Sequence, residues 1–369
     1  MTTTATPNRQ RLVLLGAGRS HVQILKSLAR RGAGEVDVTL TAPAAQYVES
    51  EMLAGYVARA YEAGDLCRPL DQPLLDRCGA KFIPGQVSGL APVERMVQLA
   101  SGDTLAYDVL SIDLEPIADR DAFEAQTPGA RAHALFVHPR AAFVQLWPRL
   151  CGLATGRALN VAIIGNDLAA AEIAMTAAPI LAAPHGSRVT WIAGSADDKP
   201  PLADEAPALA RLVLERLKRL GITVLRDQCV GLDGQSARLA SGASLQCDAP
   251  IITGNTGYPA WLLKSGLQLT DGGAPQVNQR MQSESHRQIF IAPLDASAEY
   301  GPILDANLRA ALGNGDFRAA PPPPRRRSAV SGESQAIALW GPLHLEGRMV
   351  WRWLNRRNHK RLAALFAPY

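Results

Sequence analysis

The sequence contains few cysteines and no close pair of them. None of the five forms a Cys-x-x-Cys motif, and they are spread over the chain at Cys67, Cys78, Cys151, Cys229 and Cys247. The spacing therefore indicates neither a dithiol redox centre nor a zinc site, and buried reduced thiols in a cytoplasmic protein are the plain interpretation. The seven histidines are scattered too, and no carboxylate stands at ligand spacing from His133 and His138. We expect no metal site.

Long hydrophobic runs are also missing. No stretch approaches the ~20 apolar residues that a membrane-spanning helix needs, and residues 1–9 lack the apolar core of a secretory signal. A net charge of +4 is too mild to indicate a nucleic-acid partner by itself. With 369 residues, of which 47% are hydrophobic and 20% charged, the chain is globular and long enough for about two domains.

What the chain does have is a βαβ pattern at its start. Leu12–Leu15 is a short apolar run of the kind that a buried parallel strand needs. Gly16-Ala-Gly18 predicts a tight turn, apolar residues at helical spacing follow up to Gly32, and Val36–Thr41 predicts a second strand. This unit places a pyrophosphate on a helix N-terminus. A dinucleotide site is the preferred interpretation, and a nucleotide-free α/β unit is the alternative.

The same architecture returns about 150 residues later, which indicates an internal duplication. Residues 157–175 repeat the strand, turn and helix, and Arg188–Ile192 closes the second unit. Its turn reads Gly165-Asn-Asp167, so a carboxylate stands where backbone has to approach a pyrophosphate. Two like charges within ~4 Å repel by several kcal/mol where the local dielectric is low. We therefore expect Asp167 to weaken the second unit as a dinucleotide site.

The end of the chain is basic and rich in tryptophan. Residues 319–327, which include four consecutive prolines and three arginines, predict an extended linker. In Gly347–Phe366, basic residues alternate with apolar ones, among them Trp351 and Trp353. This pattern favours a helix that lies on an anionic membrane surface. An ordinary helix packed on the body, or a dimer contact, is the alternative that the sequence leaves open.

With these elements placed, the chain resembles the flavoproteins with two dinucleotide-binding domains, in the pyridine nucleotide-disulfide oxidoreductase superfamily. Within it, the chain is similar to type II NADH dehydrogenase-like proteins, especially the branch found with or fused to selenide, water dikinase. The segments that carry this likeness are Leu12–Val22, Val38–Leu40, Ser50–Tyr56, Tyr107–Asp113, Gly301–Leu308 and Glu346–Trp353. In that family FAD occupies the first unit and NAD(P)H the second, and hydride passes to the flavin and onward to a quinone-type acceptor.

The resemblance implies a set of site residues in each unit. FAD would contact Gly16, Gly18, Arg19, Ser20, His21, Ser50, Met52, Gln86, Val87 and Asp295. The nicotinamide nucleotide would face Gly165, Asn166, Asp167, Glu172 and Gly254. No side chain is assigned as catalytic, because hydride transfer to a flavin requires no nucleophile or acid–base pair and the protein mainly positions and tunes the cofactor.

The predicted fold class is therefore α/β, with two Rossmann-like dinucleotide-binding domains of the FAD/NAD(P)-binding fold and a basic C-terminal extension. Residues 10–118 and 250–318 would form a discontinuous FAD-binding domain, and residues 155–249 an NAD(P)-binding-like domain. Residues 319–369 would be the linker and the basic amphipathic segment. We expect a cytoplasmic protein, with peripheral attachment to the inner face of the membrane and a homodimer both left open.

Several residues depart from the family pattern. Beside Asp167, the expected Ala-Gly-Asp of the second FAD motif reads Ala292-Pro-Leu-Asp295, and Glu49 and Glu51 place negative charge in the presumed flavin-lining segment. These departures keep two hypotheses open. The first is a FAD-dependent oxidoreductase that passes electrons from NAD(P)H or another donor to a quinone or small acceptor. The second is a catalytically degenerate partner or regulatory subunit that keeps the fold without turnover.

Overall fold

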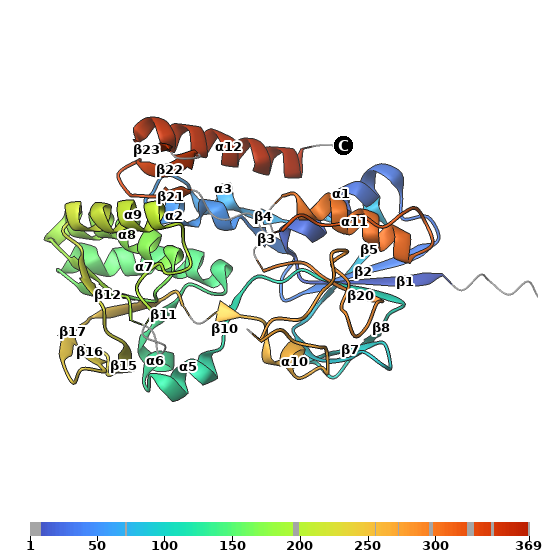
Figure 1. Cartoon of the computed structure of the whole chain (residues 1–369), viewed down its shortest axis with the longest axis horizontal. Coiled ribbons are helices and arrows are strands. Elements are labelled where there is room, and N and C mark those ends of the chain that lie inside the picture. Colours follow the sequence, from blue (N-terminus) through green and yellow to red (C-terminus); the bar gives the residue numbers. More distant parts are fainter. Residues whose placement is uncertain are drawn as a thin grey trace, which may run out of the picture.

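The computed structural model describes residues 9–70, 72–194, 199–254, 256–271, 273–294, 298–322, 328–340 and 343–367. They form two Rossmann-like units side by side, with a long C-terminal helix along one side of the molecule (Figure 1). Part of the predicted linker, residues 323–327, lies outside the described residues, as does Asp295.

The first unit is built on a five-stranded parallel sheet in the order β20-β9-β1-β2-β5. Its strands are β1 (Gln10–Leu15), β2 (Val36–Ala42), β5 (Ala80–Pro84), β9 (Val109–Ile112) and β20 (Ile289–Ile291). Side chains of β1 alternate between two cores: Leu12 and Leu14 pack with the helices, and Val13 and Leu15 pack under a three-stranded meander. The helices are α1 (Arg19–Arg31), α4 (Gln72–Cys78) and α11 (Tyr300–Ala311), and the meander is β6 (Val87–Ala91), β7 (Met96–Leu99) and β8 (Thr104–Ala106).

The second unit repeats this plan, which confirms the predicted duplication. Its parallel sheet has the order β11-β18-β12-β13-β14, formed by β11 (Leu135–Phe136), β12 (Asn160–Ile164), β13 (Arg188–Ile192), β14 (Thr223–Leu225) and β18 (Ala249–Ile252). One face is covered by α7 (Arg140–Gly156), α8 (Leu168–His185) and α9 (Pro207–Arg219). The other carries the meander β15 (Cys229–Leu232), β16 (Ser236–Leu239) and β17 (Ser244–Gln246), with α5 (Arg120–Gln126) and α6 (Ala130–His133) beside it.

Short elements connect the two units. The chain passes from the first unit to the second at β10 (Ile117–Ala118), and it returns at β19 (Thr256–Gly257), which pairs with β10 and precedes α10 (Ala260–Leu263). A separate segment follows β2 and contains β3 (Gln46–Val48), the 3₁₀ helix η1 (Ser50–Met52), α2 (Leu53–Val57), α3 (Ala63–Leu66) and β4 (Cys67–Pro69). We refer to residues 46–61 of this segment as the bridging segment, because it contacts both α1 and the C-terminal helix.

The C-terminal extension forms a small sheet and one long helix. The sheet consists of β21 (Ser328–Val330), β22 (Ala336–Trp340) and β23 (Leu343–Gly347), and packs against α8 and α9. The helix α12 (Arg348–Phe366) coincides with the helix predicted from the sequence. Its buried side, which includes Trp351 and Leu354, faces the body of the molecule.

One helix in the described part of the chain, α8, is long and apolar enough to cross a membrane by length and composition alone. More than half of it, 56%, is buried against neighbouring elements. It packs against β13, α7 and α9, which is the position of a core helix in a doubly wound fold.

Candidate dinucleotide site

The glycine turn of the first unit fits closely around the residue that follows β9. Gly16 has a φ of +95°, and a Cβ there would lie 2.3 Å from the carbonyl oxygen of Asp113. A Cβ on Gly18 would lie 2.3–2.5 Å from the carboxyl atoms of Asp113. Both positions therefore require glycine, the first for backbone conformation and the second for space.

The Asp113 carboxylate caps α1 from inside the protein. It is 2% exposed and accepts a hydrogen bond of 2.9 Å from the backbone N–H of His21. Burial raises the pKa of Asp113 above its ordinary value. Sequence reasoning did not select this residue, although a carboxylate directly after a buried strand was a signal that could have identified it.

The buried side chain of His21 stabilises the turn through hydrogen bonds of both its ring nitrogens. Its imidazole is fully buried, with Nδ1 2.7 Å from the carbonyl oxygen of Gly16 and Nε2 2.9 Å from the hydroxyl of Ser111 on β9. Burial lowers the pKa of His21, so the neutral ring donates from Nδ1 to Gly16 and accepts at Nε2 from Ser111. His21 stands at the position of the third glycine in the usual Gly-x-Gly-x-x-Gly pattern. Contacts of His21 and of the equally buried Ser20 with a pyrophosphate stay predictions.

Groups suited to the pyrophosphate and to the adenosine of a dinucleotide lie at the edge of the first sheet, where β1 and β2 end. The backbone N–H groups of Gly18 and Arg19 stand at the start of α1, where the helix itself offers them no acceptor. At the end of β2, the buried hydroxyl of Thr41 has no hydrogen-bond partner among the described residues. Gly85 beside it leads to Gln86 and Val87. An unpartnered hydroxyl at this edge fits a ribose or adenine, so these residues are compatible with FAD.

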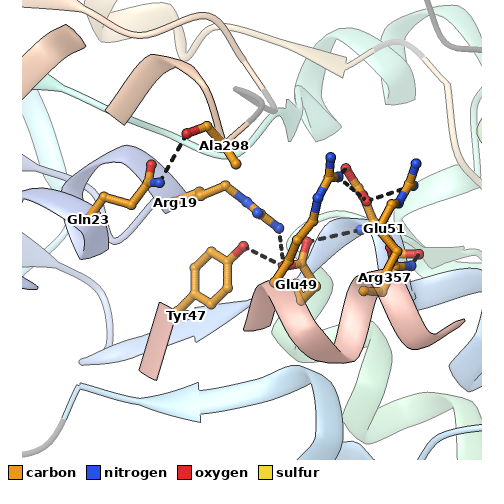
Figure 2. Close-up of polar contacts among 9 residues, drawn as sticks. Arg19, Gln23, Tyr47, Glu49, Glu51, Ala298 and Arg357 are labelled. Carbon is orange, nitrogen blue, oxygen red and sulfur yellow. Dashed lines mark hydrogen bonds and ion pairs between the residues drawn. The ribbon is translucent and has the colours of Figure 1, made fainter. Parts of the chain in front are cut away.

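A buried ion pair lies next to the turn. Arg19 is 9% exposed and Glu49 1% exposed, and the guanidinium of Arg19 donates to the carboxylate of Glu49. Tyr47 donates from its hydroxyl to the same carboxylate at 3.1 Å, and the backbone N–H of Glu51 donates to it at 3.4 Å. Figure 2 shows Arg19 reaching from α1 toward the bridging segment. Burial, and then the charge of Glu49, raise the pKa of Tyr47 above its ordinary value.

Glu51 pairs with α12. Its carboxylate lies 3.3 Å from a guanidinium nitrogen of Arg357 (Figure 2) and 3.3 Å from one of Arg361. The carbonyl oxygen of Glu51 accepts from the side-chain amide of Asn358 at 3.3 Å. The expected negative charge of Glu51 in the flavin-lining segment is thus balanced by two arginines. Ser50 is half-buried and Met52 fully buried in the same short helix.

Aromatic contacts fix α12 over the bridging segment. The rings of Trp351 and Tyr61 have centroids 5.8 Å apart, and a Cβ on Gly55 would lie 3.0 Å from the Trp351 ring. At the other end of the helix, Phe366 and Tyr47 have ring centroids 5.9 Å apart. The extension therefore covers the segment that the sequence assigned to the flavin.

The turn of the second unit contains a carboxylate of the protein itself, that of Asp167. Gly165 has a φ of +148° and packs against Gly254, and Asp167 is the N-cap of α8, accepting from the N–H of Ala170 at 2.8 Å. The carbonyl oxygen of Asn166 accepts from the N–H of Leu202 at 3.0 Å. A carboxylate therefore already lies on the helix N-terminus where a pyrophosphate binds.

Glu172 also has a structural contact in this unit. It is 5% exposed, and its carboxylate accepts from the backbone N–H of Val330 at 2.8 Å. The contact joins α8 to β21 of the C-terminal sheet. A role of Glu172 toward nicotinamide stays a prediction.

Thiol and metal chemistry find little support in the described residues. Burial raises the pKa of each of the cysteines, and that of Cys247 to about 11, which disfavours the reactive thiolate. Among the described residues, no group of three or more His, Cys, Asp and Glu side chains is arranged to hold a metal ion.

Two parallel sheets of the same plan, each with a glycine turn and a helix N-terminus at its edge, form the two-unit FAD/NAD(P)-binding fold of the similar solved structures. No protein-family model matches the sequence, and the search of curated proteins found no match.

Solved structures do match over most of the chain. One is NDH2 from Plasmodium falciparum in complex with NADH, with a TM-score of 0.72 and 12% identity over 98% of this chain and 99% of that one. Another is the sulfide:quinone oxidoreductase from the hyperthermophilic bacterium Aquifex aeolicus, with a TM-score of 0.70 and 14% identity over 96% and 91%. A third is the ferredoxin reductase for the CYP199A2 system from Rhodopseudomonas palustris, with a TM-score of 0.68 and 16% identity over 89% and 81%. At these identities the likeness shows the shared fold.

Proposed function

We propose that the protein is a FAD-dependent oxidoreductase that passes electrons from NAD(P)H or another donor through the flavin to a quinone or a small acceptor. The observation that carries the proposal is the first turn, where Gly16 and Gly18 keep the backbone of a dinucleotide site and Thr41 keeps an unpartnered hydroxyl at the sheet edge. The similar structures described as NDH2 and as a sulfide:quinone oxidoreductase support the same class of reaction. Sulfide as the donor is disfavoured, because the sequence contains no Cys-x-x-Cys pair.

In this proposal the first unit holds FAD, which supplies the hydride and electron transfer chemistry. The N–H groups of Gly18 and Arg19 would bind the pyrophosphate, and Gln86 and Val87 would lie beside the adenine. Ser50 and Met52 would line the flavin ring, and α12 would exclude water from it. Asp295 lies outside the described residues, and its predicted contact with FAD is part of this proposal.

The second unit is the proposed NAD(P)H-binding unit. It extends beyond the predicted residues 155–249, because β11 and all of β18 belong to its sheet and α7 covers that sheet. Asp167 is the residue that opposes binding there. Asp167→Asn keeps a capping side chain and removes the charge, whereas Asp167→Gly removes both and costs a few tenths of a kcal/mol of helix stability. We expect both variants to bind NADH at least about tenfold more tightly, because a repulsion of about 1.4 kcal/mol corresponds to that factor. Calorimetric titration with NADH measures it, and unchanged affinity in both variants would show that Asp167 is not the obstacle.

The C-terminal extension offers a surface for a quinone-bearing membrane. Half of the exposed large apolar side chains in the described residues gather on β22, β23 and the start of α12, at Trp340, Leu343, Leu345, Met349 and Trp353. The rings of Trp340 and Trp353 have centroids 6.2 Å apart. Exposed cations accompany them on α12, at Arg348, Arg352, Arg356 and Lys360. We call these nine residues the C-terminal patch, and tryptophan with arginine suits an anionic lipid surface.

Removing the apolar part of the C-terminal patch should abolish attachment to lipid. The triple variant Trp340→Ser, Met349→Ser and Trp353→Ser is expected to bind anionic vesicles at least about 100-fold more weakly, since each large apolar side chain contributes roughly 1.5–3 kcal/mol when buried. Cosedimentation with anionic vesicles measures this. The matched control is Val93→Ser with Leu153→Ser, two exposed apolar residues elsewhere on the surface, which should leave binding unchanged. Equal cosedimentation of the triple variant and the unaltered protein would contradict the assignment.

The proposal is tested by the absorbance spectrum of the purified protein after incubation with FAD, followed by anaerobic addition of NADH. Flavin bands that bleach support an NADH-fed flavoenzyme, and bands that persist indicate another electron donor. The second candidate function is a non-catalytic partner with the same fold. It is favoured by the Asp167 carboxylate, which caps α8 at the second turn, and by the Glu172–Val330 contact. A protein that takes up no FAD would support that candidate. Association with selenide, water dikinase, a homodimer and a cytoplasmic location stay predictions.

A further inference from the structure

The Arg19–Glu49 pair is costly where it stands. Arg19 occupies the first position of α1, where the helix dipole is positive and a cation is unfavourable. Both charges are almost completely removed from water, and the desolvation of a buried pair can exceed the attraction between its members. Packing alone therefore gives no reason for an arginine at this point of the glycine turn.

A bound pyrophosphate would supply that reason. Asp113 already places one carboxylate against the start of α1, so an additional phosphate group at this helix end needs a cation to balance it. A guanidinium binds phosphate oxygens in a bidentate manner and remains charged under all ordinary conditions. Arg19 is the residue that carries such a group on the turn itself.

We propose that Arg19 is the pyrophosphate-binding side chain of the first unit and that Glu49 holds its guanidinium until the dinucleotide binds. On binding, Arg19 exchanges the Glu49 carboxylate for a phosphate oxygen. The proposal deepens the proposed function and rests on it. It assigns Glu49 the role of a competing internal anion.

The surroundings of Glu49 allow this exchange. After Arg19 leaves, the carboxylate keeps the hydroxyl of Tyr47 and the N–H of Glu51 as donors. Glu51, the other carboxylate nearby, is engaged by Arg357 and Arg361, so it does not compete for Arg19. The bridging segment can therefore stay in place on α12 while the ion pair opens.

The test is a titration of FAD into four proteins, followed by flavin fluorescence: the unaltered chain, Glu49→Gln, Arg19→Gln and the double variant. We expect Glu49→Gln to bind FAD at least about tenfold more tightly and Arg19→Gln at least about tenfold more weakly. The double variant should bind as weakly as Arg19→Gln, because the effect of Glu49 acts through Arg19. Should Glu49→Gln fail to fold, Glu49→Asp, whose shorter side chain loosens the pair, should bind more tightly than the unaltered chain.

The control is Arg216→Gln on α9, which also removes a buried arginine from an ion pair, here at 2.8 Å to the exposed carboxylate of Glu333 and far from the turn along the chain. It should leave FAD affinity unchanged. Binding of FAD by the unaltered chain with no gain in Glu49→Gln would overturn the exchange and leave the proposed function standing. Failure of every protein to bind FAD would overturn both. Binding by Glu49→Gln alone would support both and show that the pair locks the site.

Discussion

Gly18→Asp is expected to abolish FAD binding, with a loss of affinity of at least about 100-fold. Any side chain at this position would meet the carboxyl group of Asp113 at 2.3–2.5 Å, so the turn has to shift. An aspartate would also bring a second carboxylate beside the buried Asp113, and burial has already raised the pKa of that group. The close approach of backbone to pyrophosphate is lost in either case.

Flavin fluorescence titration measures the loss, and thermal unfolding shows whether the fold persists. The control is Gly64→Asp on α3, a glycine at which a Cβ would meet nothing within 4 Å, and it should bind FAD as the unaltered protein does. Where Gly18→Asp does not fold, Gly18→Ala gives the same test with a smaller perturbation. Undiminished FAD binding by either Gly18 variant would exclude the first turn as the cofactor site.

Trp351→Ala is expected to lower the free energy of unfolding by about 3–5 kcal/mol, the usual cost of removing a buried large aromatic side chain. Trp351 is 6% exposed and joins α12 to Tyr61 and Gly55 in the bridging segment. Its loss opens a cavity and releases the helix from that segment. Chemical denaturation measures the change.

The same helix supplies the matched control for this prediction. Trp353 is 47% exposed, and Trp353→Ala should change the free energy of unfolding by less than about 1 kcal/mol. Equal effects of the two substitutions would mean that α12 does not pack on the bridging segment through Trp351.

The fold was predictable where it depends on local pattern. A short apolar run and helical spacing of apolar residues predicted β1 and α1, and the same βαβ pattern predicted β2 and its repetition at Gly165. The predicted C-terminal helix matches α12 almost to the residue. Glycine marks the first turn because φ is positive at Gly16, a local requirement that a sequence displays directly. These features need no knowledge of distant contacts.

The detailed site could not be predicted because its contacts join distant parts of the chain. His21 meets Asp113 across 92 positions, Glu172 meets Val330 across 158, and Glu51 meets Arg357 across 306. No spacing rule connects such pairs, since they depend on how helices and sheets pack. The sequence therefore identified Glu51 and Glu172 as residues of interest without indicating their structural partners.

Asp167 is a residue whose local contacts were predictable, whereas the matching carboxylate in the first unit was not. Its presence in the second turn is visible in the sequence, and the expected conflict with a pyrophosphate follows from charge alone. Its capping bond to Ala170 is also local, because an aspartate before a helix commonly accepts from the third helical residue. What the sequence did not reveal is that the first unit carries a carboxylate at its helix end as well, provided by Asp113 from another strand.

Binding of FAD at the first glycine turn is measured by a titration of FAD into the purified protein. We expect saturable binding of one FAD per chain, measured by flavin fluorescence and by the flavin that stays with the protein after gel filtration. We also expect Gly18→Asp to eliminate this binding and Gly64→Asp to leave it intact. Absence of any bound FAD at saturating concentration, or binding that survives Gly18→Asp in a folded protein, would contradict FAD binding at this turn.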